Sequence, residues 1–276
     1  MEKVKLIVDS SANLSSTTNI EVVPLKITIA GHDFIDDDQL NISELITSMA
    51  QNSEAGKTSC PSINEWLEAL EGSERAIILT ITSGLSGSFS SAFQAKEIYE
   101  KDHPQSQVIV IDSLSAGPEM TLILQEIQRL VASPTRFVDL EQKIVQYRTH
   151  THLLFVLQSL HNLSLNGRVS PAVAKIAGML KIDLVGTVSQ EGTLEPITKM
   201  RGMKRALKEI LKQMAQRNYH GGQVIIDHCE NEADANALKE QILTLYPQAD
   251  IKIRTTCGLC TFYAEKGGIM IGFADN

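Results

Sequence analysis

Short apolar runs alternate with amphipathic stretches along the chain, a pattern typical of α/β units in which a buried strand leads into a helix. In the first half the apolar runs predict four buried strands, at Val4–Val8, Val22–Ile27, Ala76–Ile81 and Val108–Ile111. In the second half they predict six more, at Leu153–Leu157, Leu184–Val188, Leu194–Met200, Gln223–Asp227, Ile251–Ile253 and Gly268–Phe273. The fold class that follows is α/β.

The predicted helices fill the gaps between these strands. Two of them begin with a capping-box pattern, in which a residue with a side-chain oxygen stands three positions before a glutamate: Asn41 before Glu44, and Ser62 before Glu65. Apolar residues at helical spacing follow each pair. Further helices are expected to start near Ser86–Ser88 and to occupy the stretches near Pro171–Leu180, Met203–Gln216 and Glu232–Leu245.

The pattern changes near residues 134–151, where a polar helix and a short polar stretch separate the two sets of strands. We therefore expect two α/β domains, a division that suits a chain of 276 residues. Residues 1–150 should carry a mostly parallel sheet with flanking helices. Residues 151–276 should carry a mixed sheet with helices, because Ser189–Thr193 resembles a hairpin loop between two strands.

Composition narrows the classes of function. Hydrophobic residues make up 43 % of the chain and the mean hydropathy is −0.04, enough apolar material for a full core. A net charge of −8 without a basic run argues against a nucleic-acid-binding protein. No apolar run reaches the length of a membrane span, and the first residues do not resemble an export signal. Four cysteines in such a chain predict free thiols in a cytoplasmic protein.

Four loops combine small hydroxyl side chains or glycines with positions near strand ends, where ligands gather in open α/β sheets. They are Asp9–Asn13, Thr58–Ser62, Thr82–Ser88 and Ile111–Ser113. In the third loop two glycines permit close backbone approach, and the helix that follows directs free N–H groups at an anion. No lysine follows as in a P-loop, so a carboxylate suits the loop better than a nucleoside triphosphate. A turn that merely caps its helix would explain the same residues equally well.

Six segments also match the motifs of one known family in order and spacing. They are Asp9-Ser10-Ser11-Ala12-Asn13-Leu14, Val23-Pro24-Leu25, Thr58–Ser62, Ser83–Ser88 with Ser91-Ala92, Asn166–Ser170 and Lys199–Gly202. In these segments the chain resembles the DegV family, from Asp9 to the C-terminus. The resemblance implies two α/β domains that hold a long-chain fatty acid such as palmitate between them. It also implies a non-catalytic carrier, without cofactor or metal, that presents the fatty acid carboxylate to a separate fatty acid kinase for acyl-phosphate formation.

The resemblance further implies which residues form the site. Thr58 and Ser86 match the family's carboxylate-binding threonine and serine, and the neighbouring Ser59, Ser83, Gly84 and Gly87 complete the head-group loops. Arg201 matches an arginine associated with the kinase encounter, and Arg168 a basic residue of structural or interfacial role, so both are expected to face the partner. Thr256 stands where relatives often carry a histidine that touches the carboxylate. A threonine donates a hydrogen bond there but supplies no positive charge.

Other interpretations remain beside the carrier. A hydrolase or phosphotransferase using Ser86 or Asp9 is the main alternative, although no base is paired with either by motif. A substrate-binding fold like that of dihydroxyacetone kinase is a third, but it requires a histidine that the sequence does not place. Asp9 is better explained as the cap of its own turn, and Asp36–Asp38 as a solvated turn. Cys257 and Cys260 have the spacing of a redox pair or half a zinc site, although ordinary free thiols are favoured.

Overall fold

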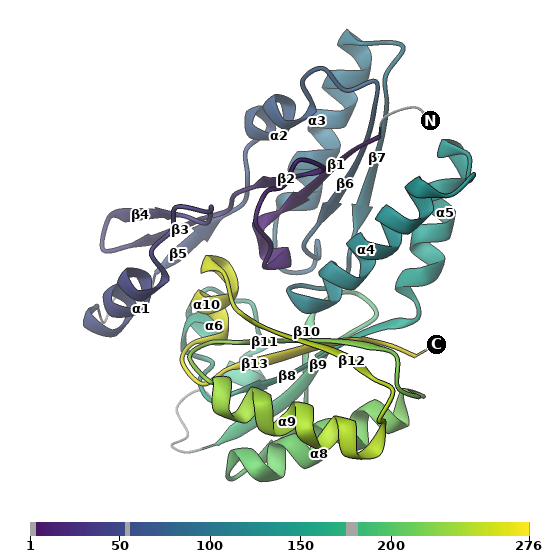
Figure 1. Ribbon diagram of the computed structural model, residues 1–276. Coiled ribbons are helices and arrows are strands. Elements are labelled where there is room, and N and C mark those ends of the chain that lie inside the picture. The colour runs from purple at the N-terminus through teal and green to yellow at the C-terminus, as the bar shows by residue number, and fades with distance from the viewer. Residues whose placement is uncertain (1–3, 53–55, 175–181, 276) are drawn as a thin grey trace.

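The computed structural model describes residues 4–52, 56–174 and 182–275, and shows two layered α/β halves, one above the other (Figure 1). Each half is built around its own sheet, and a small third sheet extends from the first half. This architecture confirms the predicted α/β class, with a parallel sheet in the N-terminal half and a mixed sheet in the C-terminal half. Within the described residues, no helix has the length and apolar character needed to cross a membrane.

The N-terminal sheet is parallel throughout, with the order β2-β1-β6-β7. Its strands are β1 (Val4–Asp9), β2 (Ile20–Val23), β6 (Arg75–Thr80) and β7 (Gln107–Asp112). Helices α2 (Ile63–Leu70) and α3 (Ser88–Asp102) cover one face, while α4 (Pro118–Ala132) and α5 (Phe137–Arg148) cover the other (Figure 1). Because helices cover both faces of this sheet, side chains on both faces of its strands are shielded from water, and the strands are therefore runs of mostly apolar residues. Their carboxyl ends point toward the second half.

The expected single strand over Val22–Ile27 is wrong. The structure has β2 ending at Val23 and a separate strand β3 (Lys26–Ile29), with Pro24 between them. Proline has no N–H to donate to a ladder, so the chain leaves the first sheet at this point. β3 then pairs antiparallel with β4 (His32–Ile35) and β5 (Lys57–Ser59), and with α1 (Ile42–Gln51) these strands form an arm that reaches the second half.

Both capping boxes were predicted at helix starts, and both positions are caps. The Asn41 side chain accepts a hydrogen bond from the Glu44 N–H at the start of α1. The Ser62 hydroxyl accepts from the Glu65 N–H, and the Glu65 carboxylate accepts from the Ser62 N–H at 2.7 Å. The second cap is important for the site because it fixes the start of α2, and only a short segment separates α2 from β5.

The C-terminal sheet is mixed, with the order β10-β9-β8-β13-β11-β12. Its strands are β8 (Thr151–Leu157), β9 (Asp183–Val188), β10 (Leu194–Met200), β11 (Gln223–His228), β12 (Asp250–Thr255) and β13 (Ile269–Ala274). Helices α8 (Met203–Gln216) and α9 (Glu232–Leu245) have the predicted bounds and pack on the outer face (Figure 1). The short helices α6 (His161–Leu165) and α7 (Pro171–Ala174) follow β8. The rest of the helix expected near Pro171–Leu180 falls outside the described residues.

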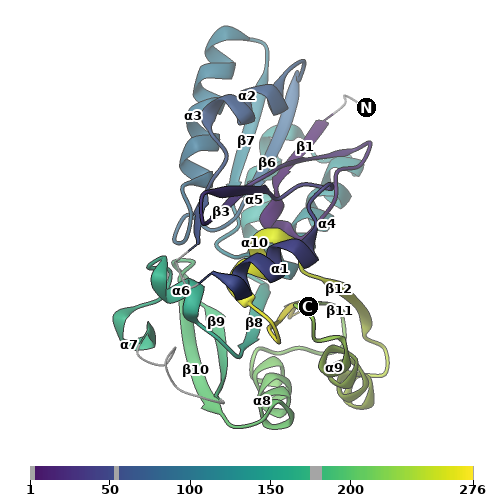
Figure 2. The ribbon, with the colours of Figure 1, turned by 90° about the vertical axis from the view of Figure 1, so that its left-hand side faces the viewer.

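Two helices link the halves. α4 belongs to the first half by sequence but also packs against β13, β8 and β11 of the second sheet. α10 (Gly258–Ala264), which the sequence pattern did not predict, belongs to the second half but packs against β3 and α1 of the arm (Figure 2). A division of the chain at residue 150 therefore stays a proposal, since elements from each side of it pack into the other.

Candidate functional site

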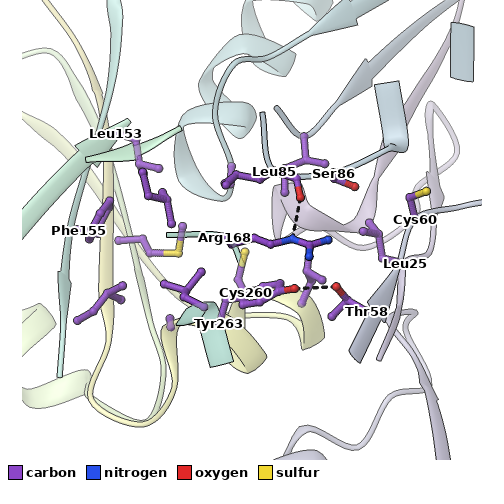
Figure 3. A pocket seen from close by; sticks show the side chains of 18 of the residues that line it. Leu25, Thr58, Cys60, Leu85, Ser86, Leu153, Phe155, Arg168, Cys260 and Tyr263 are labelled. Carbon is purple, nitrogen blue, oxygen red and sulfur yellow. Dashed lines mark hydrogen bonds between the residues drawn. The ribbon is translucent and has the colours of Figure 1, made fainter. Parts of the chain in front are cut away.

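A cavity of about 250 Å³ lies between the two halves (Figure 3). Its walls come from β5, from the loop after β6, from β8 and β10, and from α10. The lining side chains are mostly apolar, with a few hydroxyls and one arginine among them. They belong to Leu25, Thr58, Ser59, Cys60, Ile81, Leu85, Ser86, Gly87, Ala116, Leu153, Phe155, Leu157, Leu163, Arg168, Leu194, Leu259, Cys260, Tyr263, Ala264 and Met270.

One end of the cavity is polar, and we call the group of Thr58, Ser59, Ser86 and Arg168 the polar end. Thr58 and Ser59 lie on β5, while Ser86 precedes α3 and its hydroxyl accepts from the Ser88 N–H at the start of that helix at 3.3 Å. The Thr58 hydroxyl is 2.7 Å from the hydroxyl of Tyr263 on α10. Burial raises the pKa of Tyr263, so its hydroxyl remains protonated and available as a donor.

Arg168 brings a positive charge to this end. Its Nε donates to the carbonyl of Leu85 at 3.0 Å, and its Nη1 donates to the carbonyl of Asn166 at 2.5 Å. Figure 3 shows the guanidinium between Leu85 on one side and the Thr58–Tyr263 pair on the other. Arginine keeps its charge at all ordinary pH values and has five N–H donors, so two backbone contacts leave donors available for an anion.

The other end is apolar, and we call the group of Leu153, Phe155, Leu157, Leu163 and Leu194 the apolar end. The first three alternate along β8, so they project from the same face of the sheet. The Phe155 ring occupies the space beside Gly186, its partner on β9, where an added Cβ would lie 2.3 Å from the ring. A glycine at this position therefore makes room for the ring.

The predicted head-group residues divide into two groups. Thr58, Ser59, Ser86 and Gly87 line the cavity, whereas Ser83 and Gly84 are not among its lining residues. The Ser83 N–H instead binds the Asp112 carboxylate at 3.1 Å. The contacts of Gly84 are with a hairpin of the second half. The first group therefore faces the cavity, while the second supports the loop from behind.

Thr256, Arg201 and Arg168 occupy three different environments. Thr256 is buried, its hydroxyl lies 2.7 Å from the Thr261 hydroxyl, and it is not among the lining residues. Arg201 is exposed in the turn between β10 and α8. Arg168, expected to face a partner, is half-buried in the cavity wall. Of the three, only Arg168 is in position to contact a cavity ligand.

The two aspartates considered in the sequence are both buried. Asp9 caps its own turn as predicted, by accepting from the Ser11 N–H, and it also accepts from the Ser88 hydroxyl at 2.6 Å. The solvated turn predicted at Asp36–Asp38 holds for Asp37 and Asp38, which are exposed, but is wrong for Asp36, whose carboxylate accepts from the N–H groups of Gly258 and Leu259 at the start of α10. Burial raises the pKa of Asp9, and it raises the pKa of Asp36 to about 6.

All four cysteines are free thiols, as the sequence predicted. Cys60 and Cys260 line the cavity, and burial raises the pKa of both. Burial also raises the pKa of Cys257 to about 12. Uncharged thiols add to the apolar surface of the cavity. Among the described residues, no group of three or more histidine, cysteine or acidic side chains is arranged to hold a metal ion.

The sequence pattern did not predict α10 or the role of Tyr263, although this helix contributes Leu259, Cys260, Tyr263 and Ala264 to the cavity. The helix has seven residues, too few for a clear periodic pattern. Its cap is the Asp36 carboxylate, 222 positions away in the chain. No local signal could therefore have revealed it. The apolar end could not be recognised from sequence either, because a leucine that lines a cavity and a leucine in the core of a sheet give the same apolar pattern.

Comparison with known proteins agrees with this architecture. Residues 3–275 match the family model DegV, described as an uncharacterised protein of the DegV family. A DegV domain-containing protein of Streptococcus pneumoniae R6 is 39% identical over 275 residues, 98% of each chain. The crystal structure of the S. pneumoniae Fatty Acid Kinase (Fak) B3 protein, loaded with linoleic acid, is 39% identical, with a TM-score of 0.96 over 100% of both chains.

A second solved structure extends the likeness to another organism. The DegV family protein of Eubacterium eligens, loaded with heptadecanoic acid, is 37% identical with a TM-score of 0.95, and the match covers 99% of this chain and all of that one. Sequence, fold and family model thus agree over nearly the whole length. The chain belongs to the DegV family.

Proposed function

We propose that this protein binds one long-chain fatty acid, with the tail at the apolar end of the cavity and the carboxylate at the polar end. The observation that carries the proposal is the change of chemistry along a single cavity, from the leucines of β8 to the hydroxyls of Thr58 and Ser86. The fatty acids carried by the Fak B3 protein and by the E. eligens protein, at 39% and 37% identity, support the same ligand class.

The two ends divide the work of binding. A tail of about 15 carbons, at roughly 0.8 kcal/mol for each buried methylene, contributes on the order of 12 kcal/mol before the costs of association. Hydrogen bonds from two hydroxyls and a helix N-terminus add about 1–3 kcal/mol. The tail thus supplies most of the affinity, and the head group supplies orientation.

We assign Arg168 to the carboxylate rather than to a protein partner. Its guanidinium lies in the cavity wall beside Ser86 and Thr58, and a charge-assisted bond to a carboxylate is stronger than one between neutral groups. Thr256 is a neutral side chain with its own hydrogen-bonding partner, so Arg168 would supply the positive charge at the carboxylate. Ser59 and Gly87 complete the polar wall.

We further propose that the protein is a non-catalytic subunit that presents the carboxylate to a separate fatty acid kinase in the cytoplasm. Support comes from the likeness to the Fak B3 protein, and the free thiols suit a reducing compartment. Arg201 is exposed, as a residue that meets a kinase must be. Mixing the loaded protein with a bacterial fatty acid kinase and ATP should yield acyl phosphate. Arg201→Ala should slow this transfer and leave fatty acid affinity unchanged.

The ligand itself can be tested without a kinase. Purified protein is extracted under denaturing conditions and the extract is analysed by mass spectrometry, which should reveal C14–C18 acids at close to one per chain. Delipidated protein should melt at a higher temperature when palmitate is added, since a ligand that binds only the folded state stabilises it. If no lipid is extracted and palmitate produces no thermal shift, the proposed function is wrong.

A further inference from the structure

The tip of the β9–β10 hairpin, residues Ser189–Thr193, contacts the Thr82–Ser86 loop across the boundary between the two halves. The hydroxyl of Thr82 donates to the carbonyl of Gly192 at 2.9 Å and accepts from the N–H of Gly84 at 3.1 Å. Thr82 is completely buried, so both bonds are shielded from water. One hydroxyl therefore connects the loop to itself and to the opposite half.

The contact is too close for a side chain on either glycine. A Cβ on Gly192 would lie 1.9 Å from the Thr82 hydroxyl oxygen, and a Cβ on Gly84 would lie 2.8 Å from the Gly192 carbonyl oxygen. Gly192 also has a φ of +76°, which other residues rarely adopt. Backbone thus packs directly against backbone at this point, and the spacing between tip and loop is narrowly defined.

Thr82 also determines where Ser86 lies. The Thr82 carbonyl accepts from the N–H groups of both Leu85 and Ser86, each at 3.2 Å. Residues Leu85 and Ser86 line the cavity, so a shift of Thr82 would move the cavity wall. Three further contacts also hold the loop: the Ser83 N–H donates to Asp112, the Thr82 N–H donates to the Ser115 carbonyl, and Arg168 donates to the Leu85 carbonyl.

The tip is held together by hydrogen bonds within itself. The Ser189 hydroxyl accepts from the N–H groups of Glu191 at 3.1 Å and Thr193 at 3.2 Å, and the Gly192 N–H donates to the Ser189 carbonyl at 3.0 Å. The Gly192 carbonyl is thereby fixed as an acceptor for Thr82. Leu194, two residues further along, begins β10 and lines the cavity.

We propose that Thr82 and Gly192 are positioning residues for carboxylate recognition, holding Ser86 and the start of α3 in the geometry that binds the head group. The inference rests on the proposed fatty acid function. A loop held in its binding geometry beforehand loses less conformational entropy when the ligand arrives, and so binds more tightly. Neither residue lines the cavity, and both act through Ser86.

The test compares two ligands with the same tail, palmitate and the neutral hexadecanol, on delipidated full-length protein. Thr82→Val removes the hydroxyl and keeps the shape. It should raise the Kd for palmitate about 3- to 10-fold, the scale of one lost hydrogen bond, and change the Kd for hexadecanol by less than about twofold. Thr82→Ser, which keeps the hydroxyl, should restore palmitate affinity. An equal loss for both ligands, or no loss for palmitate, would overturn the positioning role.

Gly192→Ala tests the contact from the other side, and it replaces Thr82→Val if that variant does not fold. The matched control is Gly31→Ala, because Gly31 has a similar φ of +80° but nothing within 4 Å of an added Cβ. Gly192→Ala should lower palmitate affinity selectively, and Gly31→Ala should not. If Gly31→Ala has the same effect, backbone strain and not the contact is responsible. If the unmodified protein binds neither ligand, the fatty acid function itself fails.

Discussion

The two ends of the cavity are built in different ways. The polar end consists of short segments at the ends of strands, where single hydroxyls and N–H groups are fixed by a network of hydrogen bonds. The apolar end consists of the inner face of one sheet, where Leu153, Phe155 and Leu157 follow one another on β8. With the proposed ligand, the apolar end should therefore supply most of the affinity for the fatty acid, and the polar end should fix the orientation of its carboxylate. Changes at the two ends should have separable effects.

The largest expected effect comes from shortening the tail. Octanoate keeps the carboxylate but lacks eight of palmitate's methylenes, a loss of about 6 kcal/mol or roughly four orders of magnitude in Kd. Competition against a fluorescent fatty acid would measure both affinities on the same delipidated protein. If octanoate bound within tenfold of palmitate, the polar end would be the source of affinity and the comparison would be reversed.

A change at the apolar end should affect every ligand with a long tail. Gly186→Ala places a Cβ 2.3 Å from the Phe155 ring, which lines the cavity and must move to make room. Overpacking of this kind costs about 1–3 kcal/mol, so palmitate and hexadecanol should both lose roughly 5- to 100-fold in affinity. Calorimetry with each ligand gives the ratio of the two Kd values. A loss confined to palmitate would mean that the ring influences the head group.

Removal of the charge at the polar end should affect only the acid. Arg168→Met keeps the aliphatic stem and should raise the Kd for palmitate about 10- to 100-fold, since bonds between charged groups are worth roughly 1.5–3 kcal/mol. Hexadecanol should bind as before. Arg168→Lys, which keeps the charge but cannot reproduce the contact with the Leu85 carbonyl, should recover part of the loss. Unchanged palmitate affinity in Arg168→Met would remove this residue from the site.

A similar contrast, between features set by neighbouring residues and features set by distant ones, explains what the sequence could predict. Helices Met203–Gln216 and Glu232–Leu245 were placed to the residue because their periodicity is local. The loops that carry Thr58 and Ser86 stood out by their small hydroxyl and glycine residues, whereas the resemblance to the DegV family pointed to these two residues within them. Pro24 carried a local signal for the end of β2, but the apolar run around it suggested a continuous strand. Such errors concern neighbouring residues and could be corrected from sequence.

The remaining features depend on partners distant in sequence. The position of Arg168 in the cavity follows from its bond to Leu85, 83 residues earlier, and α10 depends on the carboxylate of Asp36. The role of Gly192 appears only when two halves of the chain are in contact. No spacing along the sequence encodes such contacts, so the Thr82–Ser88 loop could be singled out from sequence while its supports could not.

Loss of the two hydroxyls at the polar end should cost at most as much as loss of the charge. Thr58→Val combined with Ser86→Ala should weaken palmitate binding by about 1–3 kcal/mol, the scale of head-group hydrogen bonds between partly buried groups. Titration calorimetry measures this directly, with the two single variants showing whether the losses add. Unchanged affinity would show that the carboxylate lies elsewhere in the cavity.

The smallest expected effect is that of the Tyr263 hydroxyl, which acts on the head group through Thr58. The Tyr263 hydroxyl lies 2.7 Å from the Thr58 hydroxyl, and a donor behind Thr58 would strengthen the bond that Thr58 makes to a carboxylate. Tyr263→Phe keeps the ring and should raise the Kd for palmitate about 2- to 5-fold. The matched control is Tyr99→Phe. Tyr99 bonds to the backbone of Ser73 away from the cavity, so its loss should lower the melting temperature without changing palmitate affinity. Tighter palmitate binding by Tyr263→Phe would reveal that the tyrosine competes with the ligand for Thr58, and the polar end would then be partly occupied by its own side chains.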